Sequence, residues 1–251
     1  YKTILYDLHL LEKLYNQYEQ IGTYRQRIND GVALLQSSNV DGIIYVAMHD
    51  RHLDYLLDPM DTPLVYAYSH GTENDTYVTY SNKDSAADMI RYLLGKGHER
   101  IAVIAGHPHS YPTAQRLLGI QMAMQQAGLP LPADYIRYGD WEYESGKKET
   151  QAILQLDPLP TAIFAMNDLM AAGCMATLQA NGLRIPQDMA VAGFDNREIA
   201  SYLQPPLTTI ALPTPEIGVK AALHIMDMIN NPQPHPWREI IRCTIIERAS
   251  I

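Results

Sequence analysis

From about residue 40 onward, short runs of β-branched and apolar residues alternate with longer stretches of helical period. Strands separated by helices in this way are typical of repeated βαβ units, which build parallel sheets. The predicted strands are residues 40–47, 63–68, 101–105, 161–165, 189–194 and 240–247. The predicted helices are residues 85–94, 116–127, 168–180 and 216–229. The pattern therefore predicts an α/β fold with parallel sheets.

Two segments interrupt this alternation and are candidates for crossings between two lobes. Residues 70–76 are loose in composition, and residues 212–215 hold two prolines, which continuous helix or central strand does not tolerate. A length of 251 residues fits one large domain or two compact ones. At the start of the chain, residues 1–7 resemble a strand, and the polar-aromatic stretch that follows, residues 9–24, is compatible with a helix.

Composition excludes several classes of function. A formal net charge of −9 opposes binding of nucleic acid by this segment itself, because such binding needs clustered Lys and Arg. No apolar run approaches the ~18 residues of a membrane span, so no membrane partner is expected. Cys174 and Cys243 match no metal-binding spacing and are expected to be buried thiols. A cytoplasmic location fits, although a mature periplasmic protein would also lack a signal peptide.

Polar residues directly follow several predicted strands. Since ligands of open parallel sheets bind beyond the carboxyl ends of the strands, these residues are the candidates for a binding site. They are Asn167 and Asp168 after 161–165, Asp195 and Asn196 after 189–194, Arg116 after 101–105, Trp141 after the apolar run 135–138, and Asn82 and Asp84 after 77–80.

Together these side chains offer carboxylate and amide acceptors, guanidinium and amide donors, and one large aromatic face. Such a set can hold a polyhydroxylated ring, with the tryptophan covering its apolar C–H face. Each residue also has a structural interpretation, since Asn167 or Asp168 can cap the next helix and Trp141 can be a buried anchor. Their common position after successive strands favours a sugar-binding pocket.

Two chemical alternatives are weaker. Asp140, Glu142 and Glu144 could suggest a glycosidase, but a spacing of two in a loop favours solvated side chains over a catalytic pair. His107 and His109 flank a proline and have no evident third ligand, so no metal site is expected there. We therefore predict a binding protein that is not an enzyme and needs no cofactor.

Six sequence motifs follow one another along the chain. They are VDGII at 40–44, GHERIAVIAG at 97–106, RLLGI at 116–120, PTAIFAMND at 160–168, IPQD at 185–188 with GFD at 193–195, and PPLTTI at 205–210. Their order and spacing resemble the lactose and galactose repressor family of transcription regulators. Six motifs in the family's order, over about residues 25–251, make the resemblance specific.

This resemblance implies a periplasmic-binding-protein type I-like core of two Rossmann-like lobes with three crossovers. One lobe would comprise residues 1–97 and about 213–236, and the other residues 98–212 and about 237–251. A small-molecule effector, here a carbohydrate, would bind between the lobes. The chain would form a homodimer and would reach operator DNA only through an N-terminal domain that this sequence lacks.

By their place in the matching motifs, Arg116, Asn167 and Asp195 correspond to effector contacts, and Trp141 matches an aromatic residue that stacks on the ligand. The chain also departs from the family pattern. Ser81-Asn82 stands where the family usually has Asp-Asn, so the acidic contact is absent or supplied by Asp84. Residues 1–7 resemble the family's second strand, so its first strand–helix unit is expected to be missing.

The main alternative is a periplasmic sugar-binding protein that serves an ABC transporter, which shares both the fold and the class of ligand. PPLTTI and GHERI are more typical of the regulators. We therefore expect the effector-binding and dimerisation core of a sugar-responsive transcriptional repressor.

Overall fold

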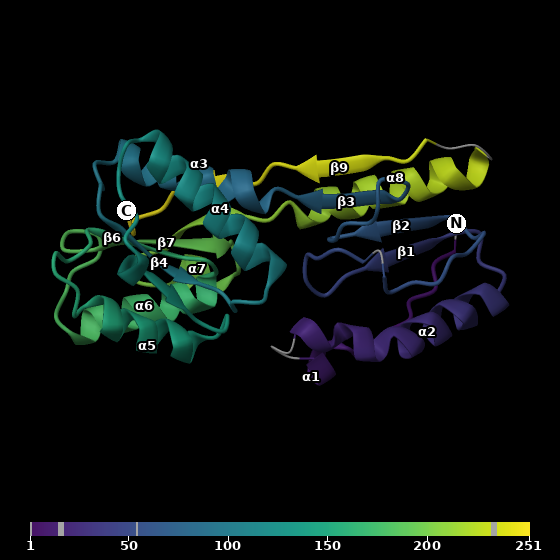
Figure 1. Cartoon of the computed structure of the whole chain (residues 1–251), viewed down its shortest axis with the longest axis horizontal. Coiled ribbons are helices and arrows are strands. Elements are labelled where there is room, and N and C mark those ends of the chain that lie inside the picture. The colour runs from purple at the N-terminus through teal and green to yellow at the C-terminus, as the bar shows by residue number, and fades with distance from the viewer. Residues whose placement is uncertain (1, 15–17, 54, 232–234) are drawn as a thin grey trace. The chain divides into compact units, whose positions relative to one another are not determined.

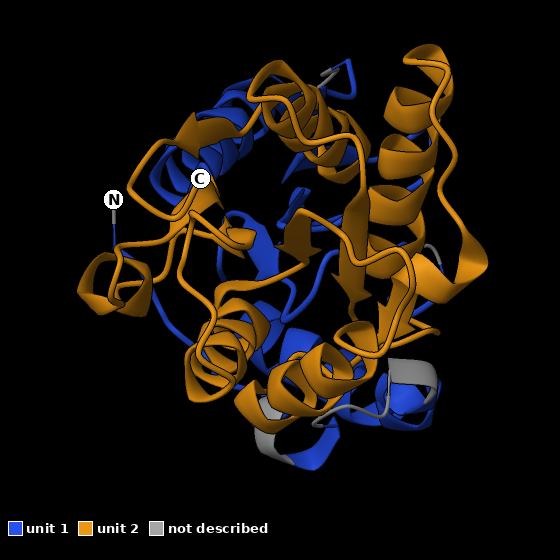
Figure 2. Ribbon diagram, turned by 90° about the vertical axis from the view of Figure 1, so that its left-hand side faces the viewer, with its two compact units in different colours: residues 1–80, 213–241 blue, residues 81–212, 242–251 orange. Residues whose placement is uncertain are grey.

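The computed structural model describes residues 2–14, 18–53, 55–231 and 235–251. The chain forms two compact units (Figure 2). Unit 1 comprises Tyr1–Tyr80 and Pro213–Ile241, and unit 2 comprises Ser81–Leu212 and Arg242–Ile251. The polypeptide thus passes from one unit to the other three times, which confirms the predicted two-lobed fold class with three crossovers.

Unit 1 is built on a four-stranded parallel sheet in the order β1-β2-β3-β9 (Figure 1). Its strands are β1 (Ile43–Val46), β2 (Leu64–Ala67), β3 (Thr76–Tyr80) and β9 (Arg238–Ile241). Its helical segments are α1 (Leu11–Leu14), the 3-10 segment η1 (Tyr18–Tyr24), α2 (Arg25–Ser37) and α8 (Thr214–Asn230). Helix α8 packs against β1, β2 and β3, and its buried face carries Ile217, Ala221 and Ile225.

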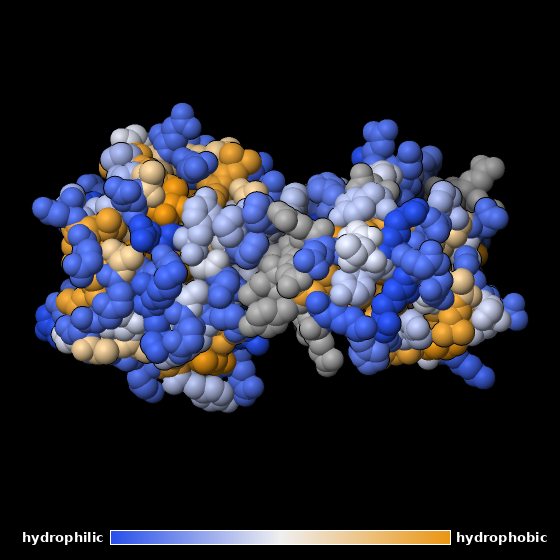
Figure 3. Space-filling model, turned by 60° about the horizontal axis from the view of Figure 1, so that its bottom comes forward, coloured by the Kyte–Doolittle hydropathy of each residue, from blue (hydrophilic) through white to orange (hydrophobic). Residues whose placement is uncertain are grey.

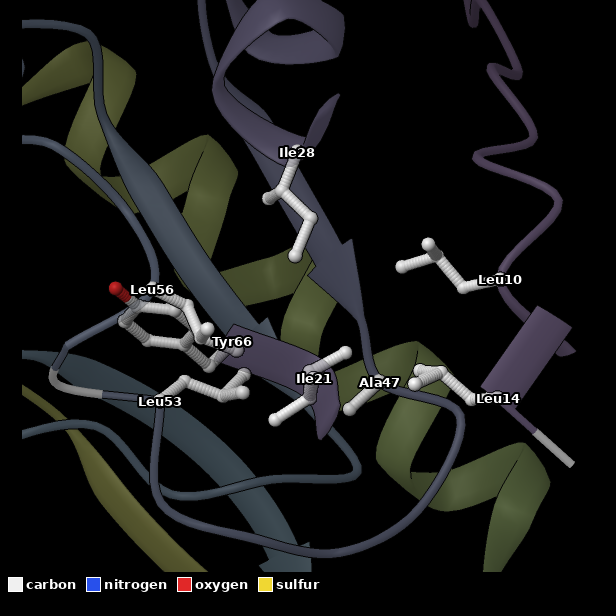
Figure 4. Close-up of a cluster of buried hydrophobic side chains, with 8 residues drawn as sticks. All are labelled: Leu10, Leu14, Ile21, Ile28, Ala47, Leu53, Leu56 and Tyr66. Carbon is white, nitrogen blue, oxygen red and sulfur yellow. The ribbon is translucent and has the colours of Figure 1, made fainter. Parts of the chain in front are cut away.

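A cluster of buried apolar side chains joins the N-terminal segment of unit 1 to its sheet. Its members are Leu10, Leu14, Ile21, Ile28, Ala47, Leu53, Leu56 and Tyr66. Figure 4 shows Leu10 and Leu14 pointing from the N-terminal segment toward the part of the cluster formed by Ile28 and Ala47. Within its described residues, the stretch predicted as compatible with a helix, residues 9–24, contains two short helical segments, α1 and η1.

The strand predicted over residues 1–7 is wrong for residues 2–7, whereas residue 1 lies outside the described residues. Residues 2–7 have no regular secondary structure, and the Leu5 side chain is 93% exposed. In place of a neighbouring strand, a cavity of about 460 Å³ lies between this segment and β1, lined by residues that include Ile4, Leu8, Ile28 and Val46. Without a strand at pairing distance, an apolar alternating run has no ladder to join.

Unit 2 is built on a six-stranded sheet in the order β10-β8-β7-β6-β4-β5. Its strands are β4 (Ile101–Ala105), β5 (Ile136–Tyr138), β6 (Ala162–Ala165), β7 (Ala190–Asp195), β8 (Thr208–Ala211) and β10 (Thr244–Ile246). All neighbours run parallel except β10, which is antiparallel to β8. The helices are α3 (Asn82–Gly95), α4 (Tyr111–Gln126), α5 (Tyr143–Ile153), α6 (Asp168–Ala180) and α7 (Ile199–Tyr202), with the 3-10 turn η2 (Ala133–Tyr135).

Helices of unit 2 approach one another closely at glycines. A Cβ at Gly119 of α4 would overlap the carbonyl oxygen of Lys83 in α3, and a Cβ at Gly173 of α6 would overlap that of Tyr143 in α5. Such contacts bring backbone against backbone, which only glycine permits. The α3–α4 and α5–α6 pairs are the most extensive helix pairings among the described elements.

Three expectations about segment boundaries differ from the structure. The single strand predicted over residues 240–247 is wrong, because β9 pairs with β3 in unit 1 and β10 pairs with β8 in unit 2. The first boundary between the units falls after Tyr80 instead of Gly97, because α3 packs along α4. The last falls after Ile241 instead of residue 236, since β9 completes the unit 1 sheet.

On the face drawn in Figure 3, hydrophilic residues predominate and hydrophobic residues form separate patches. No helix in the described ranges is long and apolar enough to cross a membrane. Both cysteines are free and buried, as expected.

Candidate functional site

The order of strands in unit 2 reverses at β4. From β4 the chain passes through α4 to the edge strand β5, and then returns through α5 to β6 on the opposite side of β4. β4 and β6 are neighbours in the sheet, and the loops that follow them therefore lead away in opposite directions at its carboxyl edge. This topological switch point is where open α/β sheets bind their ligands.

Arg116 of α4 is the centre of the polar network at this edge. Only 3% of the residue is exposed. Its Nε donates to Asn82 Oδ1 at 2.8 Å, and its Nη1 donates to the carbonyl oxygen of Met166, directly after β6. Its Nη2 lies 3.9 Å from Asp195 Oδ1 at the end of β7. One guanidinium thus joins the starts of α3 and α4 to the ends of two strands.

Two aromatic rings border the same guanidinium. Arg116 Cζ lies 3.5 Å from the centroid of the Phe194 ring and 5.6 Å from that of the Trp141 ring. Desolvated cation–π contacts of this kind hold the guanidinium plane in one orientation. The side chain is therefore fixed before any ligand binds.

Trp141 has an uncommon backbone conformation for a bulky residue, with φ at +75°. Its carbonyl oxygen accepts a hydrogen bond of 2.8 Å from Asn167 Nδ2. The ring lies against Gly106, the first residue after β4, where a Cβ would overlap it. Strained residues persist where their surroundings hold them, and they cluster at ligand-binding sites.

Asn167 has a structural task. It is the N-cap of α6, where its Oδ1 accepts from Met170 N at 2.8 Å while its Nδ2 holds Trp141. The capping interpretation of Asn167 is therefore confirmed. The same side chain also positions the tryptophan, so the two interpretations are compatible.

Two carboxylates beside the network have raised pKa values. Desolvation by burial raises the pKa of Asp195 to about 6, against the lowering effect of Arg116 and Arg197. Desolvation also raises the pKa of the fully buried Asp168 to about 7, against its hydrogen bonds with Thr209 and the backbone of Arg197. Perturbed pKa values of this size are frequent at functional sites.

Asp168 is fixed from two sides. Its Oδ1 accepts from Thr209 Oγ1 at 2.5 Å, and its Oδ2 accepts from Arg197 N at 2.6 Å. The next residues of the loop are fixed by Arg248, whose Nη2 donates to Asn196 Oδ1 at 2.7 Å. Asp195 and Asn196 both have positive φ, at 110° and 53°. The loop after β7 is thus anchored by residues from α6, β8 and the C-terminal segment.

The structure brings five of the six predicted site residues into one network, namely Arg116, Trp141, Asn167, Asp195 and Asn82. Asp84 instead forms a capping pair at the start of α3, where its backbone N and Oδ2 both bind Ser81 Oγ. Sequence reasoning missed Phe194, Thr209 and Arg248 as supports. Thr209 and Phe194 stand within the PPLTTI and GFD motifs, which was the available signal.

The alternative catalytic and metal-binding groups have other partners. Asp140 Oδ1 accepts from Glu142 N at 3.0 Å, and Glu144 pairs with Lys147. His107 Nδ1 accepts from the backbone N of His109. No cluster of three or more metal-ligating side chains occurs within residues 2–14, 18–53, 55–231 and 235–251.

Comparisons with known proteins agree with this architecture. A family model of the periplasmic binding protein-like domain matches residues 90–251. The transcriptional repressor CytR of Escherichia coli is 35% identical over 190 residues, which cover 75% of this chain and 55% of CytR. The transcriptional regulator CelR of Thermobifida fusca is 30% identical over 238 residues, which cover 93% of this chain and 67% of CelR.

A solved complex of a CelR regulator with cellobiose superposes with a TM-score of 0.76 and 29% identity, over 91% of this chain and 70% of that one. The chain therefore spans only about half to two thirds of the length of the regulators that it matches. From its motifs, fold and relatives, the chain belongs to the LacI family of transcriptional regulators, whose periplasmic binding protein-like domain it carries.

Proposed function

We propose that this chain binds a small-molecule effector, a sugar or sugar derivative, at the carboxyl edge of the unit 2 sheet. The observation that carries the proposal is the fixed arrangement of Arg116 and Trp141 at the topological switch point. A buried guanidinium and a strained aromatic residue stand side by side where ligands of open α/β sheets bind. Effector contacts are assigned to Arg116, Trp141, Asn82, Asn167 and Asp195, and more peripherally to Asp84.

The chemistry of these groups favours a polyhydroxylated ligand. Arg116 donates only, Asp195 accepts when ionised, and Trp141 offers an apolar face and one N–H. A sugar ring presents hydroxyl groups in its plane and C–H groups on its faces, and it matches such a set. The similar CelR regulator was solved with cellobiose, which is consistent with this class of ligand.

The role that we propose is regulation of transcription by a homodimer in the cytoplasm. Relatives of this chain are regulators, which supports that role over a transporter-associated binding protein. DNA would be bound through a further domain of the full regulator, because this chain has a net charge of −9. Effector binding can change DNA affinity only if it favours one conformation over another.

A thermal-shift screen tests the effector site. Monosaccharides, disaccharides including cellobiose, nucleosides and purines are each added to the purified chain. We expect a sugar to raise Tm, because a ligand that binds only the folded state stabilises it. Arg116→Lys should weaken the shift, since Lys cannot reproduce the guanidinium fork to Asn82 and Met166. Trp141→Phe keeps an aromatic face and should reduce the shift less.

Arg242→Ala provides a matched control in the same unit. Its guanidinium pairs with Asp88 and is 72% exposed, so the sugar shift should be unaltered. A response to purines or nucleosides but not to sugars would overturn the assignment of the ligand. An unaltered sugar response in both the Arg116 and Trp141 variants would overturn the site.

A further inference from the structure

Three buried polar atoms around the β4–α4 loop have no hydrogen-bond partner among the described residues. They are Ser110 Oγ, Thr113 Oγ1 and Trp141 Nε1. Ser110 is 3% exposed and Thr113 is 1% exposed. Buried polar groups in folded proteins are nearly always bonded, so three such atoms in one region need an explanation.

Ser110 is the N-cap residue of α4, yet its hydroxyl makes no capping hydrogen bond. Polar N-cap residues of two other helices in unit 2 do form this bond, because Ser81 accepts from Asp84 N at α3 and Asn167 accepts from Met170 N at α6. An N-cap serine ordinarily satisfies a free backbone N–H of the first turn. The Ser110 hydroxyl is therefore free for another partner.

Thr113 stands three residues after Ser110, and Arg116 three residues after Thr113. Residues three apart in a helix are neighbours on its surface, so the two hydroxyls and the guanidinium follow one flank of α4. Trp141 reaches the same loop from the other side, since its ring lies against Gly106 and 5.6 Å from Arg116 Cζ. Indole Nε1 can only donate a hydrogen bond.

We infer that Ser110, Thr113 and Trp141 Nε1 form a donor corner that binds an uncharged oxygen of the effector, either a sugar hydroxyl or an ether oxygen. This inference rests on the proposed function and names the groups that would donate hydrogen bonds to the ligand. The positive end of α4 adds to the preference for an acceptor. A neutral oxygen fits better than a phosphate, because the acidic Asp195 lies near the same guanidinium.

The donor corner makes two predictions of opposite sign. Without ligand, Ser110→Ala and Thr113→Val remove hydroxyls that have no partner, so Tm should stay equal or rise slightly. With ligand, each variant should bind about fivefold more weakly, because each has lost one hydrogen bond to the sugar. A residue that serves only the fold would lower both quantities.

Ser81→Ala is the matched control for stability. It removes a serine at the same helical position whose hydroxyl does cap, so Tm should fall by a few degrees. The Tm values are measured by calorimetry without ligand. If Ser110→Ala lowers Tm as much as Ser81→Ala does, the hydroxyl caps α4 and the donor corner is refuted, whatever the ligand.

Binding is measured by titration calorimetry with cellobiose, glucose and glucose 6-phosphate. We expect a neutral sugar to bind the unaltered chain more tightly than the phosphate ester, and the Ser110→Ala Thr113→Val variant to bind that sugar at least tenfold more weakly. Equal affinity in the double variant, or preference for the phosphate ester, overturns the donor corner alone. If no sugar in the wider screen binds the unaltered chain, the proposed function fails together with it.

A spectroscopic arm reports on the indole directly. The chain has two tryptophans, so Trp141 is the only one left in a Trp237→Phe background. Its emission should shift when the neutral sugar binds, because Nε1 gains an acceptor and the ring gains a neighbour. An emission spectrum that stays unchanged at saturating sugar would contradict the contact.

Discussion

The central strands β4 and β6 of the unit 2 sheet and the edge strand β1 of the unit 1 sheet are all parallel strands, but they are buried to different degrees. Every residue of β4 and β6 in unit 2 is buried. In β1 of unit 1, Ile43 is buried while Val46 is 69% exposed. Parallel strands need cover on both faces, and β1 lies at the edge of its sheet beside the 460 Å³ cavity.

This difference indicates that helices of unit 2 are packed through close backbone contacts, whereas unit 1 contains unfilled space beside β1. Each unit contains one tryptophan, Trp141 in unit 2 and Trp237 in unit 1. Trp237→Phe and Trp141→Phe therefore give single-tryptophan proteins whose fluorescence follows one unit at a time. Urea unfolding of these two backgrounds can compare the units directly.

The largest effect is expected at the α5–α6 contact of unit 2. In Gly173→Ala the new Cβ would overlap the carbonyl oxygen of Tyr143, so the two helices must separate. We expect unit 2 to lose about 3 kcal/mol of unfolding free energy, followed through Trp141. Gly95→Ala in α3 is the control, because no atom lies within 4 Å of its Cβ. An equal loss in both variants would contradict the importance of the close contact.

The next largest effect is expected in the pH dependence of the unfolding free energy of unit 2. The pKa of Asp168 is raised from 3.8 to about 7, so the folded state keeps a proton that the unfolded state releases near pH 4. Stability from this group is complete below about pH 4 and is lost as pH rises toward 7. Between pH 5 and 7 the loss should be about 2 kcal/mol.

Asp168→Asn should remove most of that slope in urea titrations followed through Trp141. The amide oxygen can still accept from Arg197 N, while the amide NH2 group can donate to the Thr209 hydroxyl, so the fold should persist. The single-tryptophan reporter of unit 1 supplies the comparison in the same buffers. An identical slope with aspartate and asparagine would show that Asp168 is ionised at neutral pH in the folded state.

Many of the unit 2 elements were predictable because helical and strand periods alternate there, although α5 and β8 were not predicted. The N-terminal strand was predicted wrongly, because periodicity reports which residues prefer burial and not whether a pairing strand is present. The prediction of a single strand over residues 240–247 was wrong for a related reason. β-Branched residues lie on both sides of Arg242 and Cys243, although the chain moves from β9 of one sheet to β10 of another.

The candidate site was predictable where a polar residue directly follows a predicted strand, as Asn167 and Asp195 do. Its supports were harder to find, because Phe194 and Arg248 meet the site only through tertiary contacts. The free hydroxyl of Ser110 was equally hidden, since a serine before a helix predicts a cap. Only the structure shows that this serine does not cap.

A matched pair of alanines tests the spare room in unit 1. Ala165 at the end of β6 is fully buried, so Ala165→Val should overpack unit 2 and cost about 1–3 kcal/mol. Ala47 follows β1 and lines the cavity, so Ala47→Val can place its methyl groups there and should gain up to about 1 kcal/mol. Unfolding of each unit is followed through its own tryptophan. If Ala47→Val costs as much as Ala165→Val, the cavity offers no usable space.

The smallest expected effect is a gain in unit 1 from a glycine that makes no close contact. Gly218 lies in the exposed interior of α8, and no atom comes within 4 Å of the position of its Cβ. Gly218→Ala should therefore stabilise unit 1 by about 0.5–1 kcal/mol, because alanine loses less conformational entropy in a helix. Urea unfolding followed through Trp237 measures it. A loss of stability would mean that this face of α8 is covered in solution, and unit 1 would then be packed as tightly there as unit 2 is at Gly173.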